Sequence, residues 1–79
     1  MSNREKYEQC FIDCFSIKKE QLNDKLVYQS VPTWDSVGHM TLIGALESAF
    51  DIQMEMDDII DFSSFNKGIE TLSKYKITI

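Results

Sequence analysis

Three segments of the chain carry apolar residues at helical spacing, and this pattern limits the fold more than any other feature. The segments run from Asn3 to about Ile17, from Ser36 to Phe50 and from about Phe65 to Tyr75. In each, apolar side chains recur three or four residues apart, which places them on one face of a helix. We expect three main helices, each with one buried face.

The connections between these segments differ in length. Helical spacing is lost from Lys18 to Trp34, where apolar residues are scattered among polar ones and Pro32 lies near the end. We expect a long loop there, with at most a short turn of helix, and loops of this length are often functional. One short helix is expected from about Asp57 to Asp61. The sequence therefore predicts an all-α fold: a four-helix bundle of three main helices and one short helix, with a long loop between helices one and two.

The chain is expected to form one domain, residues 1–79, with a small core, since a chain of this length buries only about 60% of the surface of its unfolded form. Suitable N-caps are Ser2 or Asn3 for the first helix, Ser36 for the second, and Ser63 or Ser64 for the last. The expected core residues come from all three main helices: Phe11, Cys14, Leu42, Leu46, Phe50, Phe65, Ile69 and Leu72.

The composition excludes several classes of protein. Hydrophobic residues make up 43% and charged residues 27% of the chain, values typical of a globular protein rather than a disordered or fibrous one. The sequence has no apolar run long enough to span a membrane, and its N-terminus is polar where a signal peptide needs an apolar stretch. We therefore expect a cytoplasmic location and no insertion into a membrane.

No pattern of metal ligands is present in the sequence. Cys10 and Cys14 have neither the spacing of a redox pair nor that of a zinc site, and His39 is the one histidine. The acidic residues near Asp57 lack the alternation, the central glycine and the distal glutamate of an EF-hand loop. We expect no bound metal, and we expect both thiols to pack as small apolar side chains.

The charge of the chain is unevenly distributed. Between Asp35 and Asp61 there are seven acidic residues and no Lys or Arg, so the remaining residues carry +2 of the net charge of −5. Nucleic acids and anionic lipids need a basic surface, which argues against both as partners. The acidic segment suits a basic protein surface, although a solvated acidic face without a partner would show the same pattern.

Ser36 stands where the long loop gives way to the second helix, and its neighbours are unusual. Val37 and Met40 fall on the face opposite the core face, where packing alone gives two large apolar residues no reason to be. His39 falls at the rim of the core face. A Ser36–His39 dyad is conceivable at this spacing, but the sequence offers neither an orienting acid nor an oxyanion site. A structural His39 is the simpler interpretation, and capping alone would explain Ser36.

The run from Trp34 to Ile52 resembles the acyl carrier protein family. In that family an Asp-Ser-Leu triplet opens the second helix of a four-helix bundle, and an Ala-Leu-Glu run, a Phe and an Asp-Ile end it. This chain has matching residues at the expected spacings: Asp35, Ser36, Val37, Leu42, Ala45, Leu46, Glu47, Phe50, Asp51 and Ile52. The likeness covers roughly Trp34 to Tyr75, and before Trp34 it is one of pattern only.

The resemblance implies that the Ser36 hydroxyl is esterified with 4′-phosphopantetheine donated by coenzyme A, with Asp35 as part of the same motif. A phosphopantetheinyl transferase would attach this arm, whose terminal thiol would carry an acyl or aminoacyl group as a thioester. An acyl- or aminoacyl-activating ligase and acyltransferases would be the further partners. The free N–H groups and the positive end of the dipole at a helix N-terminus favour a phosphate there. On this interpretation the chain is a monomeric carrier and not an enzyme.

The resemblance also implies that partners recognise acids on the second and third helices together with apolar residues beside the serine. By position, the partner-docking residues would be Val37, Met40, Glu47, Asp51, Glu55, Asp57 and Asp58.

Departures from the family pattern narrow the expected function. This chain lacks the further acids that fatty-acid carriers have early in helix two, and its Trp-Asp-Ser opening is more like free-standing carriers of dedicated surface-polysaccharide or specialised-metabolite pathways. Gly38 and Gly44 each lower helix stability by about 1 kcal/mol relative to Ala, which a close partner or a mobile helix would explain. The alternative function is an unmodified acidic helical module that binds another protein.

Overall fold

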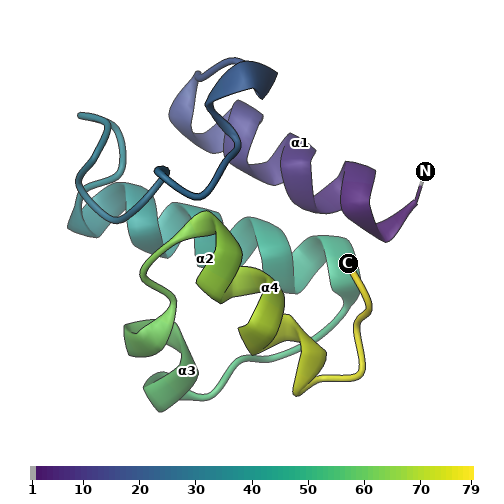
Figure 1. Ribbon diagram of the computed structural model, residues 1–79. Coiled ribbons are helices and arrows are strands. Elements are labelled where there is room, and N and C mark those ends of the chain that lie inside the picture. The colour runs from purple at the N-terminus through teal and green to yellow at the C-terminus, as the bar shows by residue number, and fades with distance from the viewer. Residues whose placement is uncertain (1) are drawn as a thin grey trace.

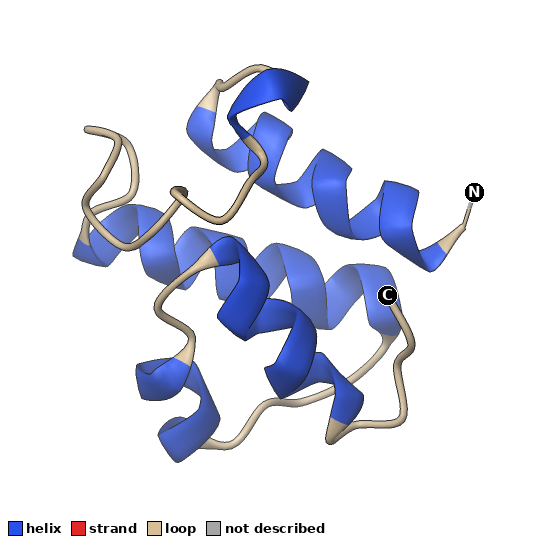
Figure 2. Cartoon of the chain, in the orientation of Figure 1, coloured by secondary structure: helices blue, strands red, loops and turns tan. Residues whose placement is uncertain are grey.

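The described residues form four α-helices, in the segments where the sequence predicts three main helices and one short one. The computed structural model describes residues 2–79, with α1 (Asn3–Phe15), α2 (Ser36–Phe50), α3 (Met56–Asp61), α4 (Phe65–Ser73) and a short 3₁₀ helix, η1 (Lys19–Gln21). α1 and α2 lie side by side and run in opposite directions, and α3 lies near the N-terminal end of α2 (Figure 1). Within residues 2–79 no strand forms (Figure 2), which confirms the predicted all-α fold with three main helices and one short one.

Side-chain caps fix where α1 and α4 begin. The Ser2 hydroxyl accepts a hydrogen bond from the Glu5 backbone N–H, and the Glu5 carboxylate accepts one from the Ser2 N–H, so the two residues form a capping box. Ser64 caps α4 by accepting from the Lys67 N–H at 2.9 Å. α1 ends two residues earlier than expected because Ser16 takes a left-handed conformation, with φ of 55°.

The expected N-cap of α2 is wrong, because the cap is Asp35 and not Ser36. Asp35 has an extended backbone conformation, and its carboxylate oxygen Oδ1 accepts a hydrogen bond from the Gly38 N–H at 2.8 Å. Ser36 is the first residue of the helix itself. Both residue types are good caps, and a carboxylate adds a favourable interaction with the helix dipole, so the aspartate takes the capping position.

The long loop before α2 is fixed to the connection between α3 and α4. The Tyr28 N–H donates to the Ser63 carbonyl oxygen and the Phe65 N–H donates to the Leu26 carbonyl oxygen, each at 2.8 Å. The Thr33 hydroxyl also donates to the Phe15 carbonyl oxygen at 2.8 Å, which ties the loop to the end of α1. These bonds hold the loop across the helices and place Tyr28 close to the start of α2.

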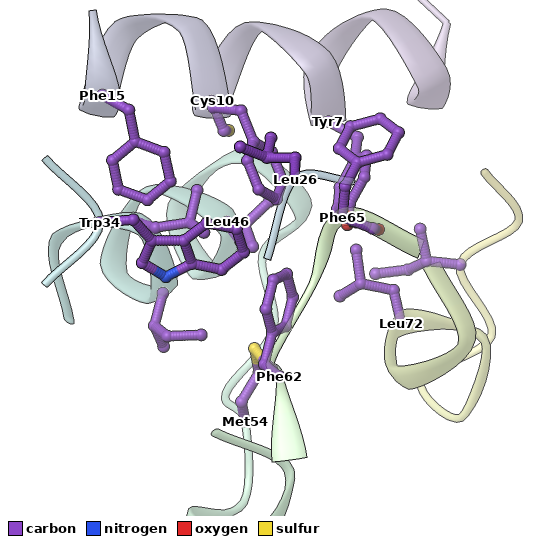
Figure 3. Packing of buried hydrophobic residues seen from close by; sticks show 14 residues of the cluster. Tyr7, Cys10, Phe15, Leu26, Trp34, Leu46, Met54, Phe62, Phe65 and Leu72 are labelled. Carbon is purple, nitrogen blue, oxygen red and sulfur yellow. The ribbon is translucent and has the colours of Figure 1, made fainter. Parts of the chain in front are cut away.

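Aromatic side chains fill the centre of the core. Phe11 packs edge-on against Tyr7, Trp34 and Phe65, with ring centroids 4.9, 5.6 and 5.1 Å apart. In Figure 3, Phe15 points from α1 toward Trp34, and Tyr7 lies beside Phe65. Each such pair contributes about 0.5–1.5 kcal/mol beyond the burial of its area. The expected core was incomplete, because buried residues also come from segments without helical spacing: Leu26, Trp34, Met54, Phe62 and Ile77. Of the residues expected there, Cys14, Phe50 and Ile69 are only half-buried.

Both cysteines are free thiols that pack in or against the core. Cys10 is buried and Cys14 is half-buried. Burial raises the pKa of the Cys10 thiol to about 11, so that thiol stays protonated and unreactive at neutral pH. The prediction that Cys10 packs as a small apolar side chain is confirmed.

The two glycines of α2 have different surroundings. A Cβ atom at Gly38 would overlap the Thr33 carbonyl oxygen, so the loop backbone packs directly on this glycine. A Cβ atom at Gly44 would meet nothing within 4 Å. The requirement for a glycine at position 38 therefore comes from the chain's own loop rather than from a partner, and no contact within the chain explains Gly44.

Candidate functional site

The Ser36 hydroxyl is exposed at the first position of α2. Its oxygen Oγ lies 3.0 Å from the Tyr28 hydroxyl oxygen, in a hydrogen bond that either group can donate. Because Asp35 caps the helix, Ser36 Oγ is not needed to satisfy the backbone. The backbone N–H groups of the first turn have no carbonyl acceptor earlier in the helix. Among them, the Gly38 N–H donates to the Asp35 side chain. An accessible hydroxyl thus stands beside the positive end of the helix dipole.

A cavity of about 310 Å³ opens beside Ser36, between α2 and α3. Its walls come from the loop, both helices and the connection that follows α3: Tyr28, Ser36, His39, Met40, Met56, Ile59, Ile60, Phe62 and Ser63. Most of these side chains are apolar, and three carry hydroxyls. A cavity of this composition suits a largely apolar ligand with a few polar atoms.

Exposed apolar side chains line this cavity or directly follow Ser36 in the chain. Val37 is 76% exposed, Met40 54%, Met56 66% and Ile60 69%, which is unusual for side chains of this size. The exposure of Val37 and Met40 agrees with the face to which their spacing assigns them. Met56 and Ile60 were not predicted, although residues four apart in a short helix lie on one face and so signal an apolar patch there.

His39 joins the loop to α3 through both ring nitrogens. Trp34 Nε1 donates to His39 Nδ1 at 3.0 Å, and His39 Nε2 lies 2.8 Å from the Ile59 carbonyl oxygen. An indole N–H can only donate, so Nδ1 carries no proton and Nε2 donates to Ile59. Neither nitrogen is free to take a proton from Ser36, whose hydroxyl bonds to Tyr28 instead. The geometry therefore contains no Ser36–His39 dyad.

The five acids predicted to meet partners fall into two groups. Asp51, Glu55 and Asp57 are exposed. Glu47 Oε2 accepts a hydrogen bond from the Met54 N–H at 2.9 Å, so this carboxylate fixes the connection between α2 and α3.

The carboxylate of Asp58 joins α3 to the end of α4. It accepts hydrogen bonds from the Tyr75 hydroxyl and from Lys74 Nζ, the latter at 3.0 Å. The bond from Tyr75, and after it that from Lys74, hold the pKa of Asp58 below its usual value. Asp58 and Glu47 thus already serve the fold, while the other three acids project into solvent.

Two other features, a metal-binding cluster and a membrane-spanning helix, are absent from the part of the chain that the structure describes. Residues 2–79 contain no cluster of three side chains suited to hold a metal ion. No helix in that range has both the length and the apolar character that crossing a bilayer requires.

Comparison with models of known protein families finds no match to this chain, and no curated protein matches its sequence. The function of the site therefore has to be inferred from its geometry and from the resemblance of the Asp35–Ser36 motif to that of acyl carrier proteins.

Proposed function

We propose that the chain is an acyl carrier protein whose Ser36 holds 4′-phosphopantetheine. The observation that carries the proposal is the position of Ser36: exposed, first in α2, relieved of capping by Asp35, and at the mouth of an apolar cavity. A serine that served only as a cap would instead bond its oxygen to a backbone N–H of the first turn. The motif around Asp35 and Ser36 supplies the chemical identity of the arm.

The attachment is a phosphoryl transfer from coenzyme A. Ser36 Oγ forms a bond to the phosphorus next to the pantetheine, and the bond to the bridging oxygen of the pyrophosphate breaks. Adenosine 3′,5′-bisphosphate leaves, and a base of the transferase takes the Ser36 proton. The resulting diester keeps one negative charge, which the free N–H groups and the dipole of α2 stabilise.

The proposed docking surface comprises four exposed apolar residues and three exposed acids. The apolar residues are Val37, Met40, Met56 and Ile60, and the acids are Asp51, Glu55 and Asp57. A phosphopantetheinyl transferase, an activating ligase and acyltransferases would each present an apolar spot with a basic rim to it. Such rim charges chiefly set the rate of encounter and the choice of partner. We place this carrier, as a monomer, in a dedicated cytoplasmic pathway.

The test is the mass of the protein after incubation with a broad-specificity phosphopantetheinyl transferase and coenzyme A. We expect the wild type to gain the mass of one phosphopantetheinyl group and Ser36→Ala to gain none. Ser48→Ala is the matched control, because Ser48 is an exposed serine of the same helix, and it should be modified like the wild type. An unchanged mass of folded wild type, or modification of Ser36→Ala, overturns the proposal.

A second candidate is an unmodified interaction module, favoured by the same exposed apolar patch around Met40 and Met56. The two candidate functions predict different effects when a variant replaces the wild-type protein in the host. A carrier loses all function in Ser36→Ala, whereas a module keeps its function in that variant and loses it in Met40→Glu.

A further inference from the structure

His39 stands between the cavity beside Ser36 and the buried aromatic core. Its ring lines the cavity and lies edge to edge with that of Trp34, which is fully buried, with centroids 6.2 Å apart and only 13° between the planes. Tyr28 and Phe62 meet the same ring edge-on, at centroid distances of 5.6 and 6.1 Å. Aromatic rings therefore close the inner end of the cavity.

Hydrogen bonds hold this closure in place. His39 Nδ1 accepts from Trp34 Nε1 and Nε2 donates to the Ile59 carbonyl oxygen, so one side chain joins the loop, α2 and α3. A ligand that passed the ring would have to break both bonds. The indole N–H is buried and would then lack a partner, which makes the displacement unfavourable.

We propose that His39 limits the cargo to short acyl or aminoacyl groups, which remain in the cavity and do not enter the core. The inference rests on the proposed carrier function, since the cargo is the group bound to the arm on Ser36. His39 is a residue that determines specificity through the depth of the cavity, and it takes no part in chemistry.

The volume of the cavity agrees with short cargo. Its 310 Å³ is about twice the ~150 Å³ of a protein cavity that holds one benzene ring, and it must also admit the end of the arm that bears the thioester. We expect a chain of a few carbons to lie beside Met40 and Ile59, which line the cavity. The outer methylenes of a long chain would remain in water unless His39 moved.

The test loads Ser36 with arms bearing saturated acyl groups of two, four, eight and twelve carbons, using the transferase and the matching acyl-coenzyme A. Unfolding temperature and Trp34 emission are measured for each form, because Trp34 is the one tryptophan of the chain. For the wild type we expect an unfolding temperature that rises to four carbons and then stays level, with unchanged emission. In His39→Ala we expect the unfolding temperature to rise by a further ~4–8 °C at twelve carbons. This is the shift that about 1 kcal/mol of added stability, here from burial of the chain, gives a domain of this size.

Thr41→Ala is the matched control, because Thr41 is exposed on α2 and does not line the cavity. Its length profile should equal that of the wild type. The proposal is overturned if twelve carbons stabilise the wild type beyond four and shift Trp34 emission, or if His39→Ala keeps the wild-type profile. If His39→Ala does not fold, the wild-type series of acyl lengths decides by itself whether the proposal holds. Intact mass separates the two proposals: without attachment to Ser36 both fall, whereas attachment followed by burial of long chains overturns only the limit on length.

Discussion

Asp35 and Ser36 are adjacent but have separate roles at the start of α2. The Asp35 carboxylate satisfies the Gly38 N–H, and this leaves the Ser36 hydroxyl exposed and bonded only to the hydroxyl of Tyr28. Had the serine been the cap, its modification would have removed a bond that the helix needs. Under the proposed function, this division of roles would let Ser36 hold its substituent while α2 keeps its first turn.

Substitutions at Asp35 test this division directly. Asp35→Ala should lower the free energy of unfolding by about 1 kcal/mol, because the Gly38 N–H loses its acceptor, whereas Asp35→Asn should lower it by only a few tenths. Urea unfolding followed by circular dichroism measures both. Equal loss in the two variants would contradict a capping role, since the amide oxygen of Asn accepts the same bond.

Within α2, the two glycines lead to opposite predictions. Gly44→Ala should raise the free energy of unfolding by about 1 kcal/mol, because a Cβ atom there meets nothing and Ala is the better helix former. Gly38→Ala should lower it by about 1–3 kcal/mol, because the added methyl group forces the Thr33 carbonyl away from the helix. Thermal unfolding of the pair decides, and a stabilised Gly38→Ala would show that the loop is not packed there.

The short helix α3 is fixed to the rest of the molecule at its two sides. His39 holds the Ile59 carbonyl from α2, and Asp58 accepts bonds from Lys74 and Tyr75 beyond the end of α4. α3 has only six residues and would not be stable as a helix by itself. These bonds therefore set the position of Met56 and Ile60 beside the cavity.

The bond between Tyr75 and Asp58 predicts a dependence of stability on acid. The pKa of Asp58 in the folded chain lies below its ordinary value of 3.8, so its contribution is present above that pH and is lost as the pH falls through the lowered value. The unfolding temperatures of the wild type and Asp58→Asn should therefore converge as the pH falls below 3.8 and through the lowered pKa of Asp58. A difference between the wild type and Asp58→Asn that stays constant as the pH falls would contradict the prediction.

The helices could be predicted from the sequence, whereas the closure of the site could not. Apolar spacing identified α1, α2 and α4 because one buried face repeats along each helix. Trp34 and Tyr28 lie in a loop with no such repeat, and their contacts with His39 depend on bonds to residues far along the chain. Ser36 was identified by the residues around it, and its role as the site of attachment remains a prediction.

Over the whole molecule, the acidic segment from Asp35 to Asp61 contains all of α2 and α3 and thus most of the cavity wall. Within it, Glu55 and Asp57 are exposed on either side of Met56, which lines the cavity. In the proposed carrier, such a charge arrangement would attract the basic rim of a partner protein toward Ser36. The field acts over about 8–10 Å at moderate salt, a distance on the order of a helix diameter, so acids elsewhere in the chain contribute little to it.

This arrangement predicts how salt affects attachment of the arm. The kcat/KM of the transferase for this protein should fall at least about threefold between ~0.05 and ~0.3 M salt, because screening removes the attraction that brings the partners together. In the double variant Glu55→Gln and Asp57→Asn, kcat/KM at low salt should fall toward the high-salt value, and its dependence on salt should become shallower. Glu70→Gln is the matched control, an exposed acid of α4 outside the acidic segment, and it should keep the wild-type slope. Equal slopes in the double variant and the wild type would mean that the acids beside Met56 form a solvated face without a role in docking.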